Sequence, residues 1–389
     1  MIKNKDYDFI IVGCGFAGAV CARKLADLKK KVLILEKRKH IAGNMYDFYD
    51  KNGLMINKYG PHIIMTDSDK VCDFLAQYDN LLKINVEMEV NVDGQNLPLP
   101  INLNAIELLY DKSKADEIKD RLISKYGYGS EINIINLLND NDLVLKSFSE
   151  DIYNKVFVGY NMKMWGISPK EIDKKIVGRV PIRLSYDNTR SKKKYNFIPE
   201  HGYTNLFTKM LDDEYIDIIT NVNGTEIIKI YEDKLYFCNE IYLGSVIYTG
   251  PLDELFDFKC GHLPYRAVYF KTTIKNKNDY FKSLAITYPT RFKKFRTSDM
   301  SRITNVHKDG KVALMSEYAG EYNIQNKKYN IPSYPIINDN NLDMFNKYEL
   351  LVKNISKFYY IGRLAEFKYY DMSQVIETAF NLINTINSK

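Results

Sequence analysis

The 389-residue sequence lacks several features that would assign it to a specialised class of protein. No apolar run approaches the roughly 18 residues that a membrane-spanning helix needs, so we expect no membrane partner. The chain starts with a short strand that runs into glycines, which is not the charged start and apolar centre of a signal peptide. There is no long basic arm, and the formal net charge is only +6. Nucleic acid is therefore a poor candidate partner, whereas an anionic small molecule suits this charge.

Cysteine and tryptophan are also scarce. The five cysteines are scattered, and no two of them have the C-x-x-C spacing. This pattern indicates reduced thiols in a cytoplasmic protein and predicts no metal site. Tryptophan occurs once, whereas tyrosine occurs 31 times. Most of these tyrosines are expected to pack with a hydrated hydroxyl, although a nucleotide-sugar site would also use several.

A glycine-rich turn lies between a predicted strand at 8–12 and a predicted helix at 19–28. Its glycines have the spacing G-x-G-x-x-G, and the second strand that follows, at 31–35, is closed by Glu36. The glycines are Gly13, Gly15 and Gly18. Two of them allow a tight turn and close approach of a pyrophosphate, the third allows helix and strand to pack, and the acid accepts from a ribose hydroxyl. The alternative is a glycine-rich turn that binds no phosphate; the agreement of all four features favours dinucleotide binding.

The end of the chain repeats this strand-then-helix pattern at 358–362 and 371–387. We therefore expect an α/β protein with α+β inserts: a discontinuous Rossmann-like domain interrupted by a helical lobe and an antiparallel-sheet lobe, with the ligand between them. The predicted divisions are 1–82, 201–261 and 337–389 for the dinucleotide domain, 102–165 for the helical lobe, and 83–101, 166–200 and 262–336 for the sheet lobe. Residues 97–102 (LPLPIN) contain two prolines and are predicted to be a connection.

Seven segments together resemble the UDP-galactopyranose mutase family. They occur in the family's order over nearly the whole chain, and the last is long and distinctive. They are EKRKHIAGNMYDFY (36–49), INKYGPHIIMT (56–66), GYNMKMWGISPKEI (159–172), RVPIRLSYDN (179–188), IPEHGYTNL (198–206), IYTGPLDELFD (247–257) and IGRLAEFKYYDMSQVIETA (361–379).

The resemblance implies an isomerase that binds FAD and interconverts the pyranose and furanose forms of a nucleoside-diphosphate sugar. In the implied mechanism, N5 of reduced FAD forms a covalent adduct with the anomeric carbon while the nucleoside diphosphate departs. A reductant such as NAD(P)H or dithionite would keep the flavin reduced. The product would be a furanose donor for cell-surface polysaccharide such as capsule, and relatives suggest a cytoplasmic homodimer.

Residues that bind the substrate are also implied by the resemblance. Arg179 and Arg296 match the pair that clamps the diphosphate, which suits permanently charged guanidinium groups. Arg296 is expected in a loop (KKFRTSD), with Arg291 and Arg302 as alternatives. The other implied substrate-binding residues are Tyr160, Trp165, Tyr334 and Tyr369. Each has a plainer interpretation: a surface ion pair for an arginine, packing for a tyrosine and a core anchor for the tryptophan.

The resemblance likewise implies the flavin site. The residues expected to contact or neighbour FAD are Gly13, Gly15, Gly18, Glu36, Arg38, Asn44, His62, Arg363, Asp371 and Met372. Asp371 can cap the last helix, whose N-terminus would stabilise negative charge on reduced flavin. His62 would lie near the flavin ring with a catalytic role, although such a histidine alone is more often simply packed. Residues 166–188 are a plausible mobile lid that carries Arg179 to the substrate.

Departures from the family pattern affect the expected substrate. Met65 stands where a second histidine is usual, and Arg190, followed by Ser191 and three lysines, stands where the bacterial galactose enzymes place a tyrosine against uracil. RSKKK is either a solvated basic loop or an altered base-recognition segment, because an arginine can stack on a base or bind a guanine edge. The substrate is therefore UDP-galactose or another nucleotide sugar, such as dTDP-fucose or GDP-heptose.

Two other functions share parts of this pattern. An FAD-dependent oxidoreductase of the amine-oxidase type would have the same glycine fingerprint and discontinuous fold, but would yield an oxidised product and peroxide in air. A flavin-binding protein without catalysis would lack the clamp arginines, and Arg179 is present.

Overall fold

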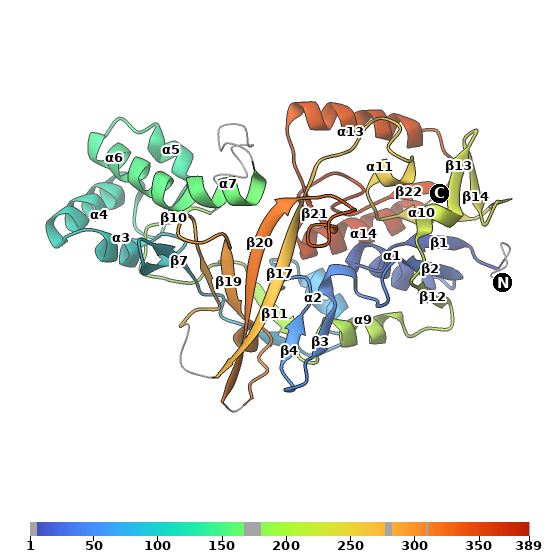
Figure 1. Ribbon diagram of the computed structural model, residues 1–389, viewed down its shortest axis with the longest axis horizontal. Coiled ribbons are helices and arrows are strands. Elements are labelled where there is room, and N and C mark those ends of the chain that lie inside the picture. Colours follow the sequence, from blue (N-terminus) through green and yellow to red (C-terminus); the bar gives the residue numbers. More distant parts are fainter. Residues whose placement is uncertain (1–5, 167–179, 277–281, 309, 389) are drawn as a thin grey trace.

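The computed structural model describes residues 6–166, 180–276, 282–308 and 310–388. The molecule is elongated and has three parts along its long axis (Figure 1). A helical lobe lies at one end, a twisted antiparallel sheet lies in the middle, and a parallel sheet with its helices forms the other end, where both chain ends are found. The predicted fold class, an α/β protein with α+β inserts, is confirmed. The residue boundaries predicted for the three parts stay a prediction.

The parallel sheet is assembled from distant parts of the chain. Its strand order is β12-β2-β1-β16-β22, and every neighbouring pair is parallel. The strands are β1 (Phe9–Val12), β2 (Val32–Glu36), β12 (Ile216–Thr220), β16 (Ser245–Tyr248) and β22 (Phe358–Tyr360). The residues of β1 and β2 are all buried, as expected for central strands covered on both faces. The first and last segments of the chain therefore meet in one sheet, as the repeated strand-then-helix pattern predicted.

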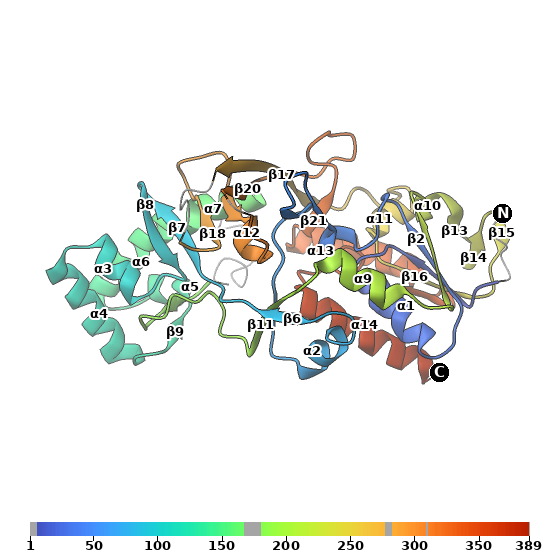
Figure 2. The same cartoon turned by 90° about the horizontal axis from the view of Figure 1, so that it is seen from below.

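Both faces of this sheet are covered (Figures 1 and 2). One core lies under the helices α1 (Phe16–Ala26), α2 (Asp69–Leu75), α9 (Tyr203–Leu211) and α14 (Met372–Asn387). The second core lies under α10 (Gly224–Ile227), α11 (Leu252–Leu255), α13 (Asp339–Val352) and a small sheet of β13 (Ile228–Tyr231), β14 (Lys234–Phe237) and β15 (Glu240–Ile241). Two apolar cores on opposite faces hold the sheet rigid, so the strand ends can position a ligand.

The central antiparallel sheet has the order β21-β17-β20-β19-β18-β7-β8. Its strands are β7 (Met88–Val92), β8 (Gln95–Leu99), β17 (Tyr265–Asn276), β18 (Ala285–Thr287), β19 (Arg296–Asp299), β20 (Lys311–Glu321) and β21 (Pro332–Pro335); β18 and β7 alone pair in parallel. The prediction that 97–102 is only a connection is wrong, because 97–99 belong to β8. This strand lies at the sheet edge, where the missing N–H of Pro98 costs no ladder bond. Next to the sheet lies α12 (Met300–Ile303).

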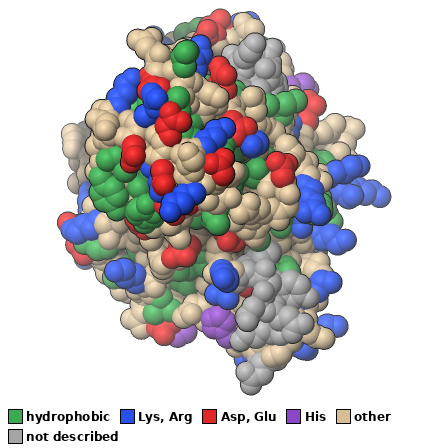
Figure 3. Space-filling view, turned by 90° about the vertical axis from the view of Figure 1, so that its left-hand side faces the viewer, with side chains coloured by type: hydrophobic (Ala, Val, Ile, Leu, Met, Phe, Trp, Pro, Cys, Tyr) green, Lys and Arg blue, Asp and Glu red, His purple; other side chains and the backbone are tan. Residues whose placement is uncertain are grey.

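The helical lobe contains α3 (Leu103–Leu109), α4 (Lys112–Tyr126), α5 (Ile134–Leu138), α6 (Leu143–Ile152), a π-helical segment (Tyr153–Val158) and α7 (Gly159–Trp165). Figure 3 shows this end of the molecule, where acidic and basic side chains are intermixed. Ion pairs such as Arg121–Asp142 at 2.9 Å and Lys125–Asp140 at 2.6 Å account for part of this mixture. The surface of the lobe therefore carries charges of both signs.

Short elements complete the described part of the chain. They are the 3₁₀ turn Gly43–Met45 and three small antiparallel groups: β3 (Asp47–Tyr49) with β4 (Met55–Asn57), β9 (Glu131–Ile132) with β10 (Ile182–Arg183), and β11 (Tyr195–Pro199) between β5 (Ile64–Thr66) and β6 (Leu81–Lys83). None of the helices in the described ranges has the length and apolar character that crossing a bilayer requires.

Candidate active site

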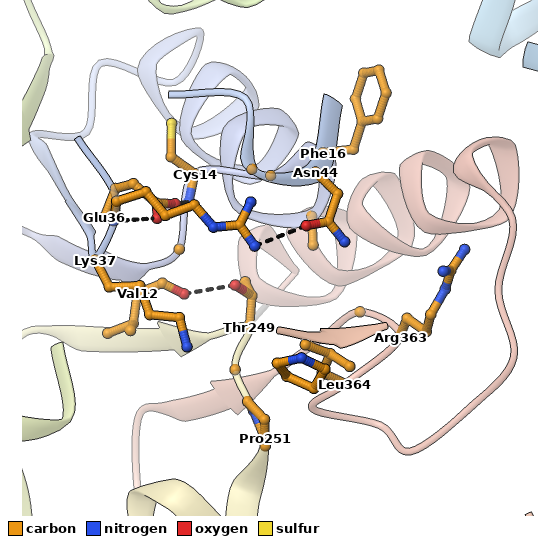
Figure 4. Close-up of a pocket in the computed structure, with 18 of the residues that line it drawn as sticks. Val12, Cys14, Phe16, Glu36, Lys37, Asn44, Thr249, Pro251, Arg363 and Leu364 are labelled. Atoms are coloured by element: carbon orange, nitrogen blue, oxygen red, sulfur yellow. Dashed lines mark hydrogen bonds between the residues drawn. The ribbon is translucent and has the colours of Figure 1, made fainter. Parts of the chain in front are cut away.

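A cavity of about 240 Å³ lies at the carboxyl ends of the parallel strands (Figure 4). Four strand ends supply its walls: Gly13 follows β1, Glu36 ends β2, Thr249 follows β16 and Arg363 follows β22. In open α/β sheets, ligands bind at this edge. We call this space the cofactor cavity.

Glycines shape the wall of the cofactor cavity. A Cβ atom on Gly18 would lie 2.0 Å from the carbonyl oxygen of Gly13, and one on Gly43 would lie 2.9 Å from Cα of Gly15. By contrast, a Cβ on Gly15 would meet no atom within 4 Å, although Gly15 lines the cavity. Gly15 is also the N-cap of α1, and it has no side chain to satisfy the first amides of that helix. The backbone is therefore shaped as a cradle with free amides, which fits a pyrophosphate.

Polar side chains stand at one end of the cavity. The carboxylate of Glu36 accepts hydrogen bonds from the backbone N–H groups of Cys14 and Arg38, both at 2.9 Å. Arg38 donates to Asn44 at 2.8 Å, and its guanidinium lies over the ring of Tyr59. Its Nη1 atom is buried and has no hydrogen-bond partner in the structure. The oriented carboxylate of Glu36 and the unpartnered Nη1 donor of Arg38 lie beside the cradle, where they fit the ribose and the polar groups of a dinucleotide.

The N-terminus of α14 reaches the other end of the cavity. Asp371 accepts from the backbone N–H of Gln374 at 2.9 Å, and the Gln374 side chain accepts from the N–H of Asp371, which forms a capping box. Asp371 caps the last helix as predicted. Met372, the first residue of α14, lines the cavity together with Arg363. The positive end of the helix dipole thus lies where negative charge on a reduced ring would be stabilised.

A second space adjoins the cofactor cavity, and the two share His62 and Met372. This space, which we call the chamber, has a volume of about 250 Å³. Most of its lining is apolar: Pro61, Ile63, Met65, Val86, Met88, Val90, Leu99, Val156, Phe157, Val180, Leu284, Ala285, Ile303 and Met372. Its charged side chains among the described residues are Arg190 and Arg296, with no carboxylate. Apolar walls strengthen the attraction of these cations for an anion.

His62 lies at the boundary between the cavity and the chamber. Burial, with smaller contributions from the charges of Arg363 and Arg296, lowers the pKa of His62 to about 3. The backbone carbonyl of His62 accepts from the hydroxyl of Tyr203 at 3.1 Å. His62 is therefore a neutral, fixed polar group near neutral pH, placed where both a cofactor and a substrate would meet it.

Arg296 is held by a buried acid. Its Nε and Nη2 atoms donate to the two oxygens of Glu317 at 2.6 and 2.7 Å, and the hydroxyl of Ser298 donates to Glu317 at 3.0 Å. Burial alone would lower the pKa of Arg296, but the charge of Glu317 and the paired hydrogen bonds raise it. Arg296 begins strand β19, so the prediction that it lies in a loop is wrong: the strand pairing places it opposite Glu317.

The two alternative arginines lie elsewhere. Arg291 packs on the ring of Phe292, and Arg302 pairs with Asp299 at 3.4 Å with 40% of its side chain exposed. Neither lines the chamber. Of the three predicted candidates, the structure brings only Arg296 to the site.

Three predicted aromatic residues form one cluster. The rings of Tyr334 and Tyr369 are stacked at 5.5 Å, and Trp165 contacts them at 6.3 and 6.0 Å. The guanidinium of Arg363 lies 4.8 Å from the ring centre of Tyr334. This cluster supports the cofactor cavity through Arg363, and none of its three rings lines the chamber.

Tyr160 lies in the chamber wall. It follows the π-helical segment, whose Val156 and Phe157 also face this space. Single π-helical turns inside helices are frequent at functional sites because they rotate the side chains that follow. Burial raises the pKa of Tyr160 despite the nearby charge of Arg296, so the phenol stays protonated and can donate.

The segment Arg190–Lys194 divides into two parts. Lys193 and Lys194 pair with Asp67 and Asp69, each at 2.5 Å, and Lys192 lies 3.5 Å from Glu131. The lysines therefore form surface ion pairs. Arg190 instead lines both the chamber and a charged groove beside it, which also contains Asp67, Glu131 and Lys193. We call this groove the mouth.

Arg179, the other predicted clamp residue, lies outside the described residues, as does most of the predicted lid at 166–188. Arg183, four residues further on, is 1% exposed and pairs with Glu131 at 2.8 Å. Among the described residues, no three His, Cys, Asp or Glu side chains form a group that could hold a metal ion.

Comparison with known sequences assigns the family. The family described as UDP-galactopyranose mutase matches residues 155–369, and a NAD(P)-binding Rossmann-like domain matches residues 11–78. The chain is 31% identical to a dTDP-fucopyranose mutase of Escherichia coli, over 95% of this chain and 96% of the relative. It is 32% identical to a UDP-galactopyranose mutase of Mycoplasma genitalium, over 96% and 93%.

The chain belongs to the UDP-galactopyranose mutase family. The predicted family and an isomerase of the mutase type are thereby confirmed, and the family together with the dinucleotide domain implies FAD as cofactor.

Solved structures agree at the level of fold. A crystal structure of reduced UDP-galactopyranose mutase matches with a TM-score of 0.70 at 18% identity, covering 98% of this chain and 96% of that one. A putative protoporphyrinogen oxidase from Exiguobacterium matches with a TM-score of 0.64 at 12% identity, covering 98% and 99%. Mutases and oxidases thus share this architecture, and the sequence rather than the fold separates them here.

Sequence reasoning missed Glu317 and the chamber wall. Glu317 lies on the same face of its strand as the buried residues Ala313 and Met315, since the three are spaced two residues apart. The period-two pattern could therefore have identified Glu317 as an inward-facing acid. The wall residues of β7, β18 and the π-helical segment carry no local signal, because an apolar strand residue looks the same in a core and in a pocket.

Proposed function

We propose that this protein interconverts the pyranose and furanose forms of a nucleoside-diphosphate sugar with reduced FAD as its working cofactor. One observation carries the proposal: a nearly apolar chamber with two arginines and no carboxylate in its described lining opens onto the cofactor cavity at His62. A diphosphate needs fixed cations, and a reactive anomeric carbon needs a dry site beside the cofactor.

The residues present fit FAD. The glycine cradle, the free amides at the start of α1, Glu36 and the orphaned Nη1 of Arg38 suit its dinucleotide part. The N-terminus of α14, with Met372 and Arg363, would meet the ring. When bound in its reduced form, the flavin supplies a nitrogen nucleophile for the anomeric carbon, so no side chain of the protein has to attack it. The cell would supply a reductant such as NAD(P)H.

Arg296 would hold the departing diphosphate. The Nε and Nη2 atoms of Arg296 donate to Glu317, so Nη1 of Arg296 is directed elsewhere. The plane of the guanidinium is thereby fixed before the substrate binds. A charge held in place needs no reorganisation as negative charge develops on the leaving group. Arg179 is the second proposed clamp residue. Tyr160 can donate from the chamber wall, and we propose that Trp165, Tyr334 and Tyr369 contribute to the substrate site from their cluster.

The chamber also bears on the nucleotide base. Because the sugar must face the cofactor cavity, the base extends along the apolar lining of the chamber, which includes Val86, Met88, Val90 and Phe157. The described lining has no amide or carboxylate side chain to accept from the Watson–Crick edge of guanine. Apolar contact instead favours a pyrimidine, and the methyl group of thymine adds a contact that uracil lacks. The proposed preference is dTDP-sugar over UDP-sugar over GDP-sugar, with Arg190 at the edge of the base.

The test is incubation of the purified protein and dithionite with UDP-galactose, dTDP-fucose and a GDP-heptose in separate reactions, with ring size followed by NMR. We expect a furanose product from at least one dTDP- or UDP-sugar and no net oxidation. Peroxide in air together with oxidised amine or alcohol, and no ring isomer, would establish the amine-oxidase type of function instead.

Arg179→Ala and Arg296→Ala are the accompanying variants. Each should abolish turnover while FAD stays bound; Arg296 is not part of the lining of the cofactor cavity. Arg302→Ala, at a side chain that is 40% exposed and lines neither the cofactor cavity nor the chamber, is the matched control and should keep full activity. A role in furanose supply for cell-surface polysaccharide, a cytoplasmic location and a homodimer complete the proposal and rest on the relatives and the sequence.

A further inference from the structure

The loop that leads into Arg296 lies against helix α7. Residues 288–295 connect β18 to β19, and the two strands pair directly at Thr287 and Arg296. Thr287 and Arg296 belong to the sheet wall of the chamber, whereas Phe157 and Tyr160 belong to its helical wall. The separation of these two walls therefore depends on how α7 lies against the 288–295 loop.

Lys163 of α7 ties the helix to this loop. Its ammonium group donates to the backbone carbonyl of Tyr288 at 2.7 Å and to that of Phe292 at 2.5 Å. Burial lowers the pKa of Lys163, and no carboxylate in the described part of the chain pairs with it. Hydrogen bonds from a charged donor are roughly twice as strong as those between neutral groups. The two carbonyls therefore give α7 a firm attachment to the loop.

Two further contacts hold α7 at its ends. A Cβ atom on Gly159, the first residue of the helix, would lie 2.5 Å from the carbonyl oxygen of Pro289, so the backbones of helix and loop approach closely. At the other end, Arg266 of β17 donates to the carbonyls of Met164 at 2.5 Å and Lys163 at 2.9 Å. A cation is favoured at a helix C-terminus because it satisfies the last carbonyls. Helix α7 is thus held along its whole length.

We propose that Lys163 is a positioning residue for the bound nucleotide: its two hydrogen bonds keep the 288–295 loop, and with it Arg296, at a fixed distance from the helical wall of the chamber. Lys163 does not line the chamber, so it acts through the residues that do. The rings of Tyr160 and Phe295, 6.0 Å apart, also join the two walls. The inference rests on the proposed function in taking the chamber as the place where the nucleotide binds.

The affinity of the FAD-loaded protein for dTDP and UDP, measured by calorimetry, tests this role. Lys163→Met keeps a long apolar stem and removes the donors. We expect the Kd for both nucleotides to rise about tenfold while the FAD content stays the same. Lys163→Arg can still donate to two carbonyls, so its Kd should stay within about threefold of the wild-type value. An unchanged Kd in Lys163→Met would overturn the proposal.

Lys293→Met separates the effect of position from the effect of charge. Lys293 is exposed on the same loop, and no hydrogen bond or ion pair joins it to the described residues. Its replacement removes the same charge and leaves the attachment of α7 intact, so we expect wild-type affinity. If Lys293→Met weakens nucleotide binding as much as Lys163→Met does, Lys163 contributes only its charge and the positioning role is wrong.

The only tryptophan of the chain provides a measurement that needs no nucleotide. Trp165 is the last residue of α7 and is 5% exposed. When the helix is less firmly attached, its indole should become more accessible, so acrylamide quenching of its fluorescence should rise about twofold in Lys163→Met. Lys293→Met should be quenched like the wild type. Wild-type quenching in Lys163→Met would show that α7 does not depend on this attachment, and would refute the proposal.

Should Lys163→Met fail to fold, Gly159→Ala disturbs the same helix and loop from the other contact, because its Cβ meets the carbonyl of Pro289. It should weaken nucleotide binding in the same way and leave flavin bound. Loss of flavin together with nucleotide affinity in both variants would show that α7 supports the whole fold, against a positioning role.

The two proposals fail separately. A protein that binds nucleotide through Lys163 but forms no ring isomer contradicts the proposed function. A protein that forms the ring isomer, with unchanged nucleotide affinity in Lys163→Met, contradicts this inference.

Discussion

The cofactor cavity and the chamber share a boundary at His62, yet they are built in different ways. Backbone builds most of the cofactor cavity: glycines at close approach, free amides at the start of α1 and the capped end of α14. Side chains build the chamber, brought from β7, β18, β19, the π-helical segment and the segment at Arg190. A backbone-built site tolerates few changes, because each change moves the fold. A side-chain-built site can be altered one residue at a time, which suits the place where substrates are distinguished.

The largest effect should come from Gly18→Ala in the cofactor cavity. The new Cβ would lie 2.0 Å from the carbonyl oxygen of Gly13, so α1 must move away from β1. We expect a loss of about 3 kcal/mol in the free energy of unfolding and little bound flavin. Thermal unfolding and the flavin absorbance of the purified protein measure both.

Gly15→Ala is the matched control for that variant. Its Cβ would meet no protein atom within 4 Å, and its φ of −82° suits any residue. The melting temperature of the flavin-free protein should therefore stay the same, while the Kd for FAD rises by about tenfold or more because the methyl group enters the cradle. Unchanged FAD affinity would mean that the cofactor does not use this cradle.

In the chamber, Glu317→Gln should lower kcat/KM by about a hundredfold, because it removes the buried counter-charge and one strong acceptor of Arg296. FAD content should stay at the wild-type level, which separates the chamber from the cofactor cavity. Glu321→Gln, at the exposed end of the same strand, is the control and should behave as wild type. Loss of flavin in Glu317→Gln would show that the two spaces are not independent.

At the boundary, His62 should make stability depend on pH. Its pKa is lowered from 6.5 to about 3, so between these values the unfolded chain binds a proton that the folded protein does not. The free energy of unfolding should therefore fall as pH falls below 6.5, by at most about 1.4 kcal/mol per pH unit from this residue. Denaturant unfolding of the wild type and His62→Gln over this range checks it. Parallel curves for the two proteins would contradict a neutral, buried His62.

The smallest effect should come from Asp371→Ala at the start of α14. Loss of the cap should cost about 1 kcal/mol of stability, measured by denaturant unfolding. Asn338→Ala removes the equivalent cap of α13 and should cost a similar amount. Only Asp371→Ala should also shift the reduction potential of bound flavin, because Asp371 lines the cofactor cavity. If the reduction potential of bound flavin is the same in both variants, the N-terminus of α14 does not contribute to the electrostatic environment of the cofactor.

The sequence by itself determined the parts whose conformation is encoded locally. The glycine spacing, the buried strand beside it and the D-x-x-Q start of the last helix each demand one backbone geometry, and the structure has all three. The motifs across the chain determined the family as well, because their order and content are specific even where the fold is shared with oxidases.

Only the tertiary structure decided how side chains from distant strands meet. Two prolines suggested a connection at 97–102, but Pro98 is tolerated in strand β8 because this strand lies at the edge of the sheet. The residues around Arg296 suggested a loop, whereas in the structure Arg296 pairs with Glu317 of the neighbouring strand. The contacts of Glu317 with Arg296 depend on the register between strands β19 and β20. Those relations arise from the free energy of the whole core, and no short segment contains them.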